Sequence, residues 1–372
     1  MDALAVCTRG LEEVLDAELA SLGIKSRRTA KGGITFRGST RDLYKANVWL
    51  RSASRVVVRI GRFRATTFRD LEREIATLDW DAYLDEYTLP RLRVSSGSSR
   101  LHHTGAIAER ILKALGVDPA FEYVEGPDAP ATQAFVVRAT HDEFTISVDA
   151  SGENLHRRGW RQATAKAPLR ESLAGAMVLA SGWRGERPLL DPMCGSGTIA
   201  IEAALLAQGR APGANRSFAF QQWPTFEPGT WASVRADVTR AETEAAGRAL
   251  PLIIAADRDA GGVAAATANA ARAGVADVVT IERSALAETL ATRTAPDEPS
   301  GLILTNPPYG ARVGGRDLRD LYATLGRAGT WDVGMLIANR SLAGHTKLTL
   351  DERFRTTNGG IPVTFAQTPP RT

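Results

Sequence analysis

Short apolar runs alternate with helical runs through residues 188–372, and this alternation constrains the fold more than any other feature of the chain. The runs that fit strands are Pro188 to Asp191, Leu252 to Ala256, Val278 to Ile281, Leu302 to Thr305, Val333 to Ala338 and Ile361 to Phe365. Strands that alternate with helices are typical of a parallel, doubly wound sheet. We therefore predict an α/β unit whose ligand site lies at the carboxyl ends of its strands.

The N-terminal half mixes strands and helices in a different order. Apolar spacing predicts strand, helix, strand, helix and strand over residues 1–70, with the strands at 4–7, 33–38 and 55–60. Residues 71–150 continue with a strand at 92–95, a helix at 105–115 and a hairpin that turns at His141 and Asp142. We expect a compact α+β region, followed by a hinge at 151–187 in which a helix starts at Pro168.

Composition restricts the class of protein. Of the 372 residues, no apolar run approaches the length of about 18 that a membrane helix needs, and the N-terminus lacks the pattern of a secretion signal. We therefore expect a cytoplasmic protein. The two cysteines, Cys7 and Cys194, are too few for a disulfide framework or a four-cysteine zinc site, so we expect two reduced thiols.

Positive charge is concentrated near the N-terminus. Residues 25–69 carry 13 lysines and arginines and a single acid, Asp42. Such a block is typical of a surface that binds a phosphate backbone, with a solvated basic face as the alternative. The candidate backbone contacts, taken from this block, from the polar loop near residue 100 and from the hinge, are Lys31, Arg55, Arg100, His156, Arg157, Arg158 and Arg161.

A glycine-rich turn follows the first strand of the C-terminal half and reads Asp191-Pro192-Met193-Cys194-Gly195-Ser196-Gly197-Thr198. The glycines permit a tight turn and the close approach of a ligand, and Ser196 or Thr198 can cap the helix that follows. Asp191 can accept a hydrogen bond from a cationic amino group, which S-adenosylmethionine has and NAD lacks. The candidate cofactor residues are Asp191, Met193, Cys194, Gly195, Ser196 and Gly197.

The second strand of this half ends in another acid, Asp257. An acid at this position can bind both hydroxyls of an adenosine ribose, whereas Asp259 fits a helix N-cap better. The long separation between the glycine turn and Asp257 indicates an insertion at 208–250. We expect the aromatic residues of this insertion to pack beneath the glycine turn.

Asn306-Pro307-Pro308-Tyr309 follows the apolar strand at 302–305. An exocyclic amine conjugated to a ring is a poor nucleophile because its lone pair is delocalised. The Asn306 side-chain oxygen and the Pro307 carbonyl can accept the two amine hydrogens and so direct the lone pair toward a methyl group. The Tyr309 ring offers a face on which a planar group can stack. We predict that all four residues are catalytic and that Asn306 also borders the cofactor.

Together, the glycine turn and this tetrapeptide resemble the signature of the bacterial large-subunit rRNA guanine-N2 methyltransferases, which join an RNA-capturing THUMP domain to a Rossmann-like methyltransferase domain. Segments at 46–56, 155–160 and 167–173 also resemble that family. The resemblance implies a class I methyltransferase sheet, S-adenosylmethionine as cofactor, no metal, and structured RNA as partner. Where the family commonly places an acid near the adenine amine, this chain has Ser284, which becomes the candidate contact.

The resemblance also implies four parts of the chain: a ferredoxin-like subdomain at 1–65, a THUMP region at 66–152, a linker and helix at 153–187, and a methyltransferase domain at 188–372. It makes a guanine N2 in 23S rRNA the leading target. Guanine N2 in tRNA, adenine N6 in DNA and a protein glutamine use the same tetrapeptide, but the basic half argues against a protein substrate. A non-catalytic RNA-binding protein is disfavoured by the intact motifs, and we expect neither membrane attachment nor an obligate protein partner.

Overall fold

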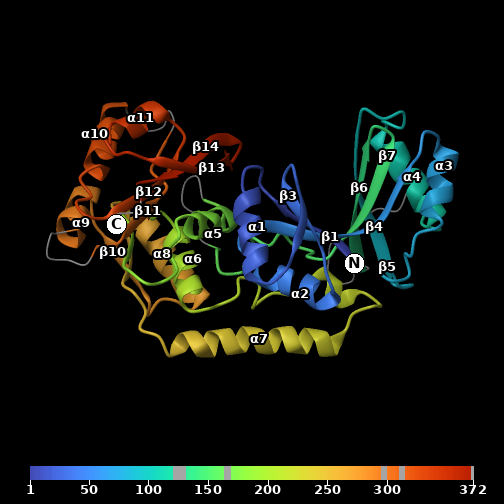
Figure 1. Cartoon of the computed structure of the whole chain (residues 1–372), viewed down its shortest axis with the longest axis horizontal. Coiled ribbons are helices and arrows are strands. Elements are labelled where there is room, and N and C mark those ends of the chain that lie inside the picture. The colour runs from blue at the N-terminus through green and yellow to red at the C-terminus, as the bar shows by residue number, and fades with distance from the viewer. Residues whose placement is uncertain (120–130, 163–168, 295–299, 310–314, 370–372) are drawn as a thin grey trace.

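Two seven-stranded sheets form the protein, one from each half of the chain. The computed structural model describes residues 1–119, 131–162, 169–294, 300–309 and 315–369. Figure 1 shows the N-terminal sheet in blue to green and the C-terminal sheet in green to red at opposite ends of the molecule, with a long helix running beneath both. Within the described residues, no helix has the length and apolar character needed to cross a membrane.

The N-terminal sheet has the strand order β2-β3-β1-β4-β7-β6-β5. Its strands are β1 (Asp2–Cys7), β2 (Ser26–Ala30), β3 (Gly33–Arg37), β4 (Ala53–Arg64), β5 (Thr88–Gly97), β6 (Ala131–Thr140) and β7 (Glu143–Asp149). Its helices are α1 (Glu12–Ser21), α2 (Thr40–Trp49), α3 (Phe68–Ile75) and α4 (Thr104–Ala114). Strand β4 pairs with β1 along its first part and with β7 along its second, so one sheet runs through the whole region.

Local signals account for most of these elements. Ser39, one of two capping candidates in the sequence with Thr40, caps α2 and forms a reciprocal capping box with Asp42. The predicted hairpin is confirmed, because His141 and Asp142 adopt φ values of 53° and 63° between β6 and β7. Strand β2 and helix α3 were not predicted. Strand β2 lies at the edge of the sheet and has the sequence SRRTA, which carries no apolar alternation.

The C-terminal sheet has the strand order β10-β9-β8-β11-β12-β14-β13. Its strands are β8 (Leu189–Asp191), β9 (Ile253–Asp257), β10 (Val279–Arg283), β11 (Leu302–Thr305), β12 (Asp332–Ile337), β13 (Asp351–Asn358) and β14 (Ile361–Gln367). The helices of this half are α5 (Glu171–Ala180), α6 (Thr198–Ala207), α7 (Pro228–Ala246), α8 (Ala260–Ala273), α9 (Leu286–Arg293), α10 (Gly315–Leu325) and α11 (Arg340–Gly344).

This sheet is doubly wound, as predicted. Successive strand residues point to opposite faces, so Leu189 and Leu302 join the core shared with α5, α6 and α8, while Leu190 and Ile303 join the core beneath α9 and α10. The strands are parallel from β10 to β12, but β14 is antiparallel to both β12 and β13. The sequence did not predict β13 (DERFRTTN), an edge strand with few apolar residues.

The insertion does not pack beneath the glycine turn, which corrects the expectation from the sequence. Its aromatic rings instead surround Tyr44 of α2, with Phe220 stacked at a centroid distance of 4.2 Å and Trp231 edge-on at 6.0 Å. The backbone N–H of Glu227 donates to the Tyr44 hydroxyl, and Arg41 of α2 pairs with Asp237 of α7. The insertion thus joins the two halves, and α7 runs below both in Figure 1.

Candidate functional site

Three strands of the C-terminal sheet bring their carboxyl ends together. The chain order reverses between neighbouring strands β8 and β11, and a doubly wound sheet binds ligands at such a point. Asp191 ends β8, Asp257 ends β9 and Asn306 follows β11. The Thr305 hydroxyl donates to Asp191 Oδ1 over 2.8 Å and ties the two central strands together at this edge.

Asp191 is a buried carboxyl group, only 1% exposed. Burial is the main cause that raises its pKa to about 7, and the nearby charge of Asp257 raises it further. Hydrogen bonds from Thr305 and from the Met193 backbone N–H offset part of this shift. Among the described residues no lysine or arginine pairs with Asp191. A buried acid without a protein cation fits the cationic amino group of S-adenosylmethionine.

The glycine turn presents bare backbone to this edge. Gly195 and Gly197 have φ values of 52° and 79°, in the left-handed region that favours glycine. Gly197 is the N-cap of α6, and no side chain caps that helix. The expectation that Ser196 or Thr198 caps α6 is therefore wrong. The first-turn N–H groups stay free of side-chain partners, which leaves the positive end of the helix open to a ligand.

Asp257 supports the glycine turn from the neighbouring strand. Its Oδ2 accepts from the Gly195 backbone N–H over 2.9 Å, and its Oδ1 accepts from the Asp259 backbone N–H over 2.9 Å. Asp259 caps α8 by accepting from the Gly261 N–H, as predicted. Asp257 is half-buried, so part of its carboxylate still faces the site.

Ser284 lies directly beyond Asp257, since its backbone N–H donates to the Asp257 carbonyl. Its hydroxyl lies 3.2 Å from Oε2 of Glu288, which is exposed in the first turn of α9. Sequence reasoning missed Glu288. Ser284 precedes the N-cap Ala285, and the first turn of α9 brings Glu288 back beside it.

Asn306 carries a buried acceptor with no partner. Its Oδ1 is inaccessible to solvent and accepts no hydrogen bond from the described residues. Most buried polar atoms in proteins are hydrogen-bonded, so an unpaired one at a strand end fits a donor supplied by a ligand. Pro307 is buried, and Pro308 and Tyr309 are half-buried. The residues that follow, 310–314, lie outside the described part of the chain.

Tyr309 is held in place from the last hairpin of the sheet. Asn358, at the end of β13, donates from Nδ2 to the Tyr309 hydroxyl over 2.7 Å. The tight turn at Gly359 and Gly360 follows immediately, with φ values of 57° and 84°. Asn358 was not identified from the sequence, because nothing local marks a contact that spans 49 residues.

The predicted backbone contacts divide into two groups. Lys31, Arg100 and Arg157 are exposed. Arg55 pairs with the buried Asp149, and Arg161 pairs with Glu171. Arg158 pairs with Glu202, and its side chain is only 1% exposed. These three guanidinium groups hold the fold together, so they do not fit the open RNA-binding face predicted from the sequence.

His156 also departs from the sequence prediction. Burial and the surrounding arginines lower its pKa to about 4, so the imidazole is neutral at pH 7 and adds no positive charge there. The basic block is partly neutralised in the same way by acids distant in sequence. Arg59 pairs with Asp2, and Arg62 pairs with Glu143.

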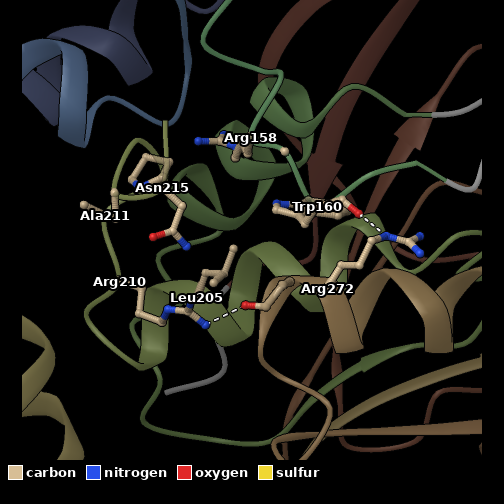
Figure 2. Close-up of a pocket in the computed structure, with 11 residues that line it drawn as sticks. Arg158, Trp160, Leu205, Arg210, Ala211, Asn215 and Arg272 are labelled. Carbon is tan, nitrogen blue, oxygen red and sulfur yellow. Dashed lines mark hydrogen bonds between the residues drawn. The ribbon is translucent and has the colours of Figure 1, made fainter. Parts of the chain in front are cut away.

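A separate cavity of about 210 Å³ lies between the linker, the start of the insertion and the end of α8. Figure 2 shows it bordered by Arg158 and Trp160 from the linker, Arg210 and Asn215 from the insertion, and Arg272 of α8. The cavity adjoins the last residues of α8 and is connected to the glycine turn through them. Arg272, which lines the cavity, donates to the Asn269 side chain, and Asn269 Nδ2 donates to the Ser196 carbonyl of the turn.

The sheet order, the glycine turn at the strand reversal and the acids at the ends of β8 and β9 define a class I methyltransferase fold. Within the described residues, no three histidine, cysteine or acidic side chains gather as they would around a metal ion.

Comparison with known proteins identifies the family. Residues 158–359 match the RMKL-like methyltransferase domain, and residues 2–57 match the RlmL ferredoxin-like domain. The chain belongs to the RMKL-like methyltransferase family. It therefore combines an N-terminal ferredoxin-like domain with a C-terminal Rossmann-like methyltransferase domain.

Three solved structures resemble the whole chain. A possible methylase from Clostridium difficile 630 is 30% identical, with a TM-score of 0.86 and coverage of 100% of this chain and 99% of that one. A predicted N6-adenine-specific DNA methylase from Listeria monocytogenes is 30% identical, with a TM-score of 0.85 and coverage of 100% and 96%. SMU.472, solved in complex with SAH, is 27% identical, with a TM-score of 0.85 and coverage of 100% and 98%. The cofactor of the protein is S-adenosylmethionine.

Proposed function

We propose that the protein methylates the exocyclic N2 amine of a guanosine in structured RNA, with 23S rRNA as the substrate. The observation that carries the proposal is the buried Oδ1 of Asn306 at the end of β11, which has no hydrogen-bond partner among the described residues. An exocyclic amine has N–H groups that can satisfy such an acceptor. The choice of guanine and of rRNA rests on the resemblance of the two sequence motifs to the guanine-N2 rRNA methyltransferases.

Four residues of the turn and strand ends hold the cofactor in this proposal. Asp191 accepts from its amino group, and the backbone at Gly195 and Gly197 lies against it. Asp257 binds the ribose hydroxyls with the part of its carboxylate that faces the site. The bound cofactor supplies a methyl group on a positively charged sulfur. Ser284, with Glu288 beside it, contacts the adenine amine.

The tetrapeptide positions the target amine. Asn306 Oδ1 and the Pro307 carbonyl accept its two hydrogens, so the nitrogen lone pair is directed at the methyl group. After transfer the nitrogen carries an extra proton, which passes to water. Tyr309 stacks on the base, and the hydrogen bond from Asn358 holds its ring in position. Positioning supplies most of the rate in such a site, because none of these groups is a strong base.

RNA capture belongs to the N-terminal half. We assign a THUMP region to residues 66–152, after a ferredoxin-like subdomain at 1–65 and before the linker at 153–187. Lys31, Arg100 and Arg157 are exposed and available to phosphates. These cations attract RNA electrostatically without reading its sequence.

Two other substrates remain candidates. Adenine N6 in DNA is favoured by one observation, the 30% identity to the predicted N6-adenine-specific DNA methylase from Listeria monocytogenes. Guanine N2 in tRNA uses the same chemistry and the same tetrapeptide.

Transfer of tritium from labelled cofactor to separated rRNA, tRNA and DNA, followed by nucleoside analysis, tests the proposal. We expect N2-methylguanosine in rRNA. N6-methyladenine would instead establish the DNA or adenine activity. In calorimetric titrations Asp257→Ala should weaken cofactor binding more than tenfold, while Asp259→Ala, which removes only the cap of α8, should change it less than threefold. Asn306→Ala should lose methyl transfer, with a smaller loss of cofactor binding than Asp257→Ala. Normal transfer by this variant would contradict the assigned chemistry.

A further inference from the structure

The cavity at the end of α8 is lined by cations and by no acids. Its described lining residues include Arg158, Arg210 and Arg272, and no aspartate or glutamate is among them. The cavity lies between the linker and the insertion, the two segments that connect the N-terminal half to the methyltransferase sheet.

The arginines at the rim have no acidic partner among the residues that the structure describes. Arg210 donates to the carbonyl oxygens of Ala273 and Gly274, and Arg272 donates from Nε to the Trp160 carbonyl. These partners are neutral, so the two guanidinium groups project a net positive potential into the cavity. Figure 2 shows two of these bonds as dashed lines, from Arg210 to Ala273 and from Arg272 to Trp160.

The cavity wall also holds donors with no acceptor. Arg158 and Trp160 are each 5% exposed, and Arg158 Nη1 and Trp160 Nε1 have no hydrogen-bond partner in the described part of the chain. In Figure 2 the Trp160 indole extends toward the space between Arg158 and Asn215. Arg158 also shares the carboxylate of Glu202 with Arg51. A buried donor without a partner destabilises the protein, and an anionic acceptor in the cavity removes that penalty.

We propose that this cavity binds a phosphate group, presented either by an RNA backbone or as a free phosphate. Arg210, Arg272 and the Asn215 amide contact it at the rim, while Trp160 Nε1 donates to it from the wall. A phosphate offers several acceptor oxygens and negative charge. Both match a cavity whose described lining has N–H donors and arginines but no carboxylate. Asn269 connects Arg272 at the rim to the Ser196 carbonyl, so the proposed phosphate site adjoins the glycine turn on the side of α8. The proposal that the phosphate belongs to an RNA backbone depends on the proposed function, whereas binding of a free phosphate does not.

The indole N–H of Trp160 provides a direct reporter in the full-length protein. Trp160→Phe assigns its nitrogen–proton NMR signal, because one indole signal disappears. We expect this signal to move and saturate when inorganic phosphate is added at constant ionic strength. Arg210→Gln and Arg272→Gln should each weaken the response at least tenfold. Arg240→Gln, an exposed arginine of α7, is the matched control and should change it less than twofold.

In a second titration, a structured RNA hairpin is added in place of inorganic phosphate. A shift of the Trp160 signal with RNA identifies a backbone phosphate, and a shift with phosphate alone identifies a free phosphate. A signal that moves with neither ligand overturns the proposal, as does a response that Arg210→Gln and Arg272→Gln leave intact. The phosphate titration does not involve methyl transfer, so its result is independent of the proposed function. Loss of transfer with an intact phosphate response would instead count against the proposed substrate.

Discussion

The hydrogen bond between Asn358 and Tyr309 should control how the substrate base is held. Asn358 is 8% exposed, and its Nδ2 donates to the Tyr309 hydroxyl over 2.7 Å. The Asn358→Ala variant removes this donor and leaves the ring free to rotate away from its position. A hydrogen bond of this kind contributes about 1 kcal/mol net, which corresponds to roughly a fivefold change in rate.

Methyl transfer to RNA is the assay, with kcat and KM measured separately. We expect kcat to fall about fivefold in Asn358→Ala while the affinity for S-adenosylmethionine is unchanged, since the bond lies on the substrate side. Thr357→Ala is the control, because Thr357 is the exposed neighbour on the same strand. In the Tyr309→Phe variant the acceptor hydroxyl is already absent, so adding Asn358→Ala should lower kcat only slightly further. An equal loss in both backgrounds would refute the role of this hydrogen bond.

Three further predictions concern stability and reactivity. Because burial raises the pKa of Asp191 from 3.8 to about 7, folding favours its protonated form, and the free energy of unfolding without cofactor should fall as pH rises from about 4 to 7. In urea unfolding experiments, the free energy of unfolding of Asp191→Asn should not show this decrease between about pH 4 and 7. Tyr44→Ala removes the ring that joins α2 to the insertion and should cost about 3–5 kcal/mol, whereas Tyr87→Ala, at a side chain 73% exposed, should change stability by less than about 0.5 kcal/mol. Burial raises the pKa of both Cys7 and Cys194, so neither native thiol should react with a disulfide reagent at pH 8, and rapid labelling would contradict their burial.

The sequence alone predicted those structural elements whose stabilising contacts lie within a few residues along the chain. Capping at Ser39, the turn at His141 and Asp142, and the apolar strands 253–257 and 302–305 each leave a signal within a few residues. The glycine turn and the acids at the strand ends were found in the same way, since a doubly wound sheet brings those ends together.

Long-range contacts escaped prediction because their partners are far apart in the chain. The exposed edge strands β2 and β13 lack the apolar alternation that marks a strand. Arg55 and Arg158 are basic in the sequence, yet buried acids 94 and 44 residues away neutralise them. The link from Asn358 to Tyr309 depends on a hairpin whose position is set by the whole sheet.

The aromatic cluster around Tyr44 bears on how such a protein can evolve. The Tyr44 ring of α2 packs among rings of the insertion, so each half of the chain contributes to one shared aromatic cluster. Exchange of one half for that of a distant homologue would pair mismatched surfaces and expose large apolar rings. We therefore expect substitutions in α2 to covary with substitutions between residues 218 and 231.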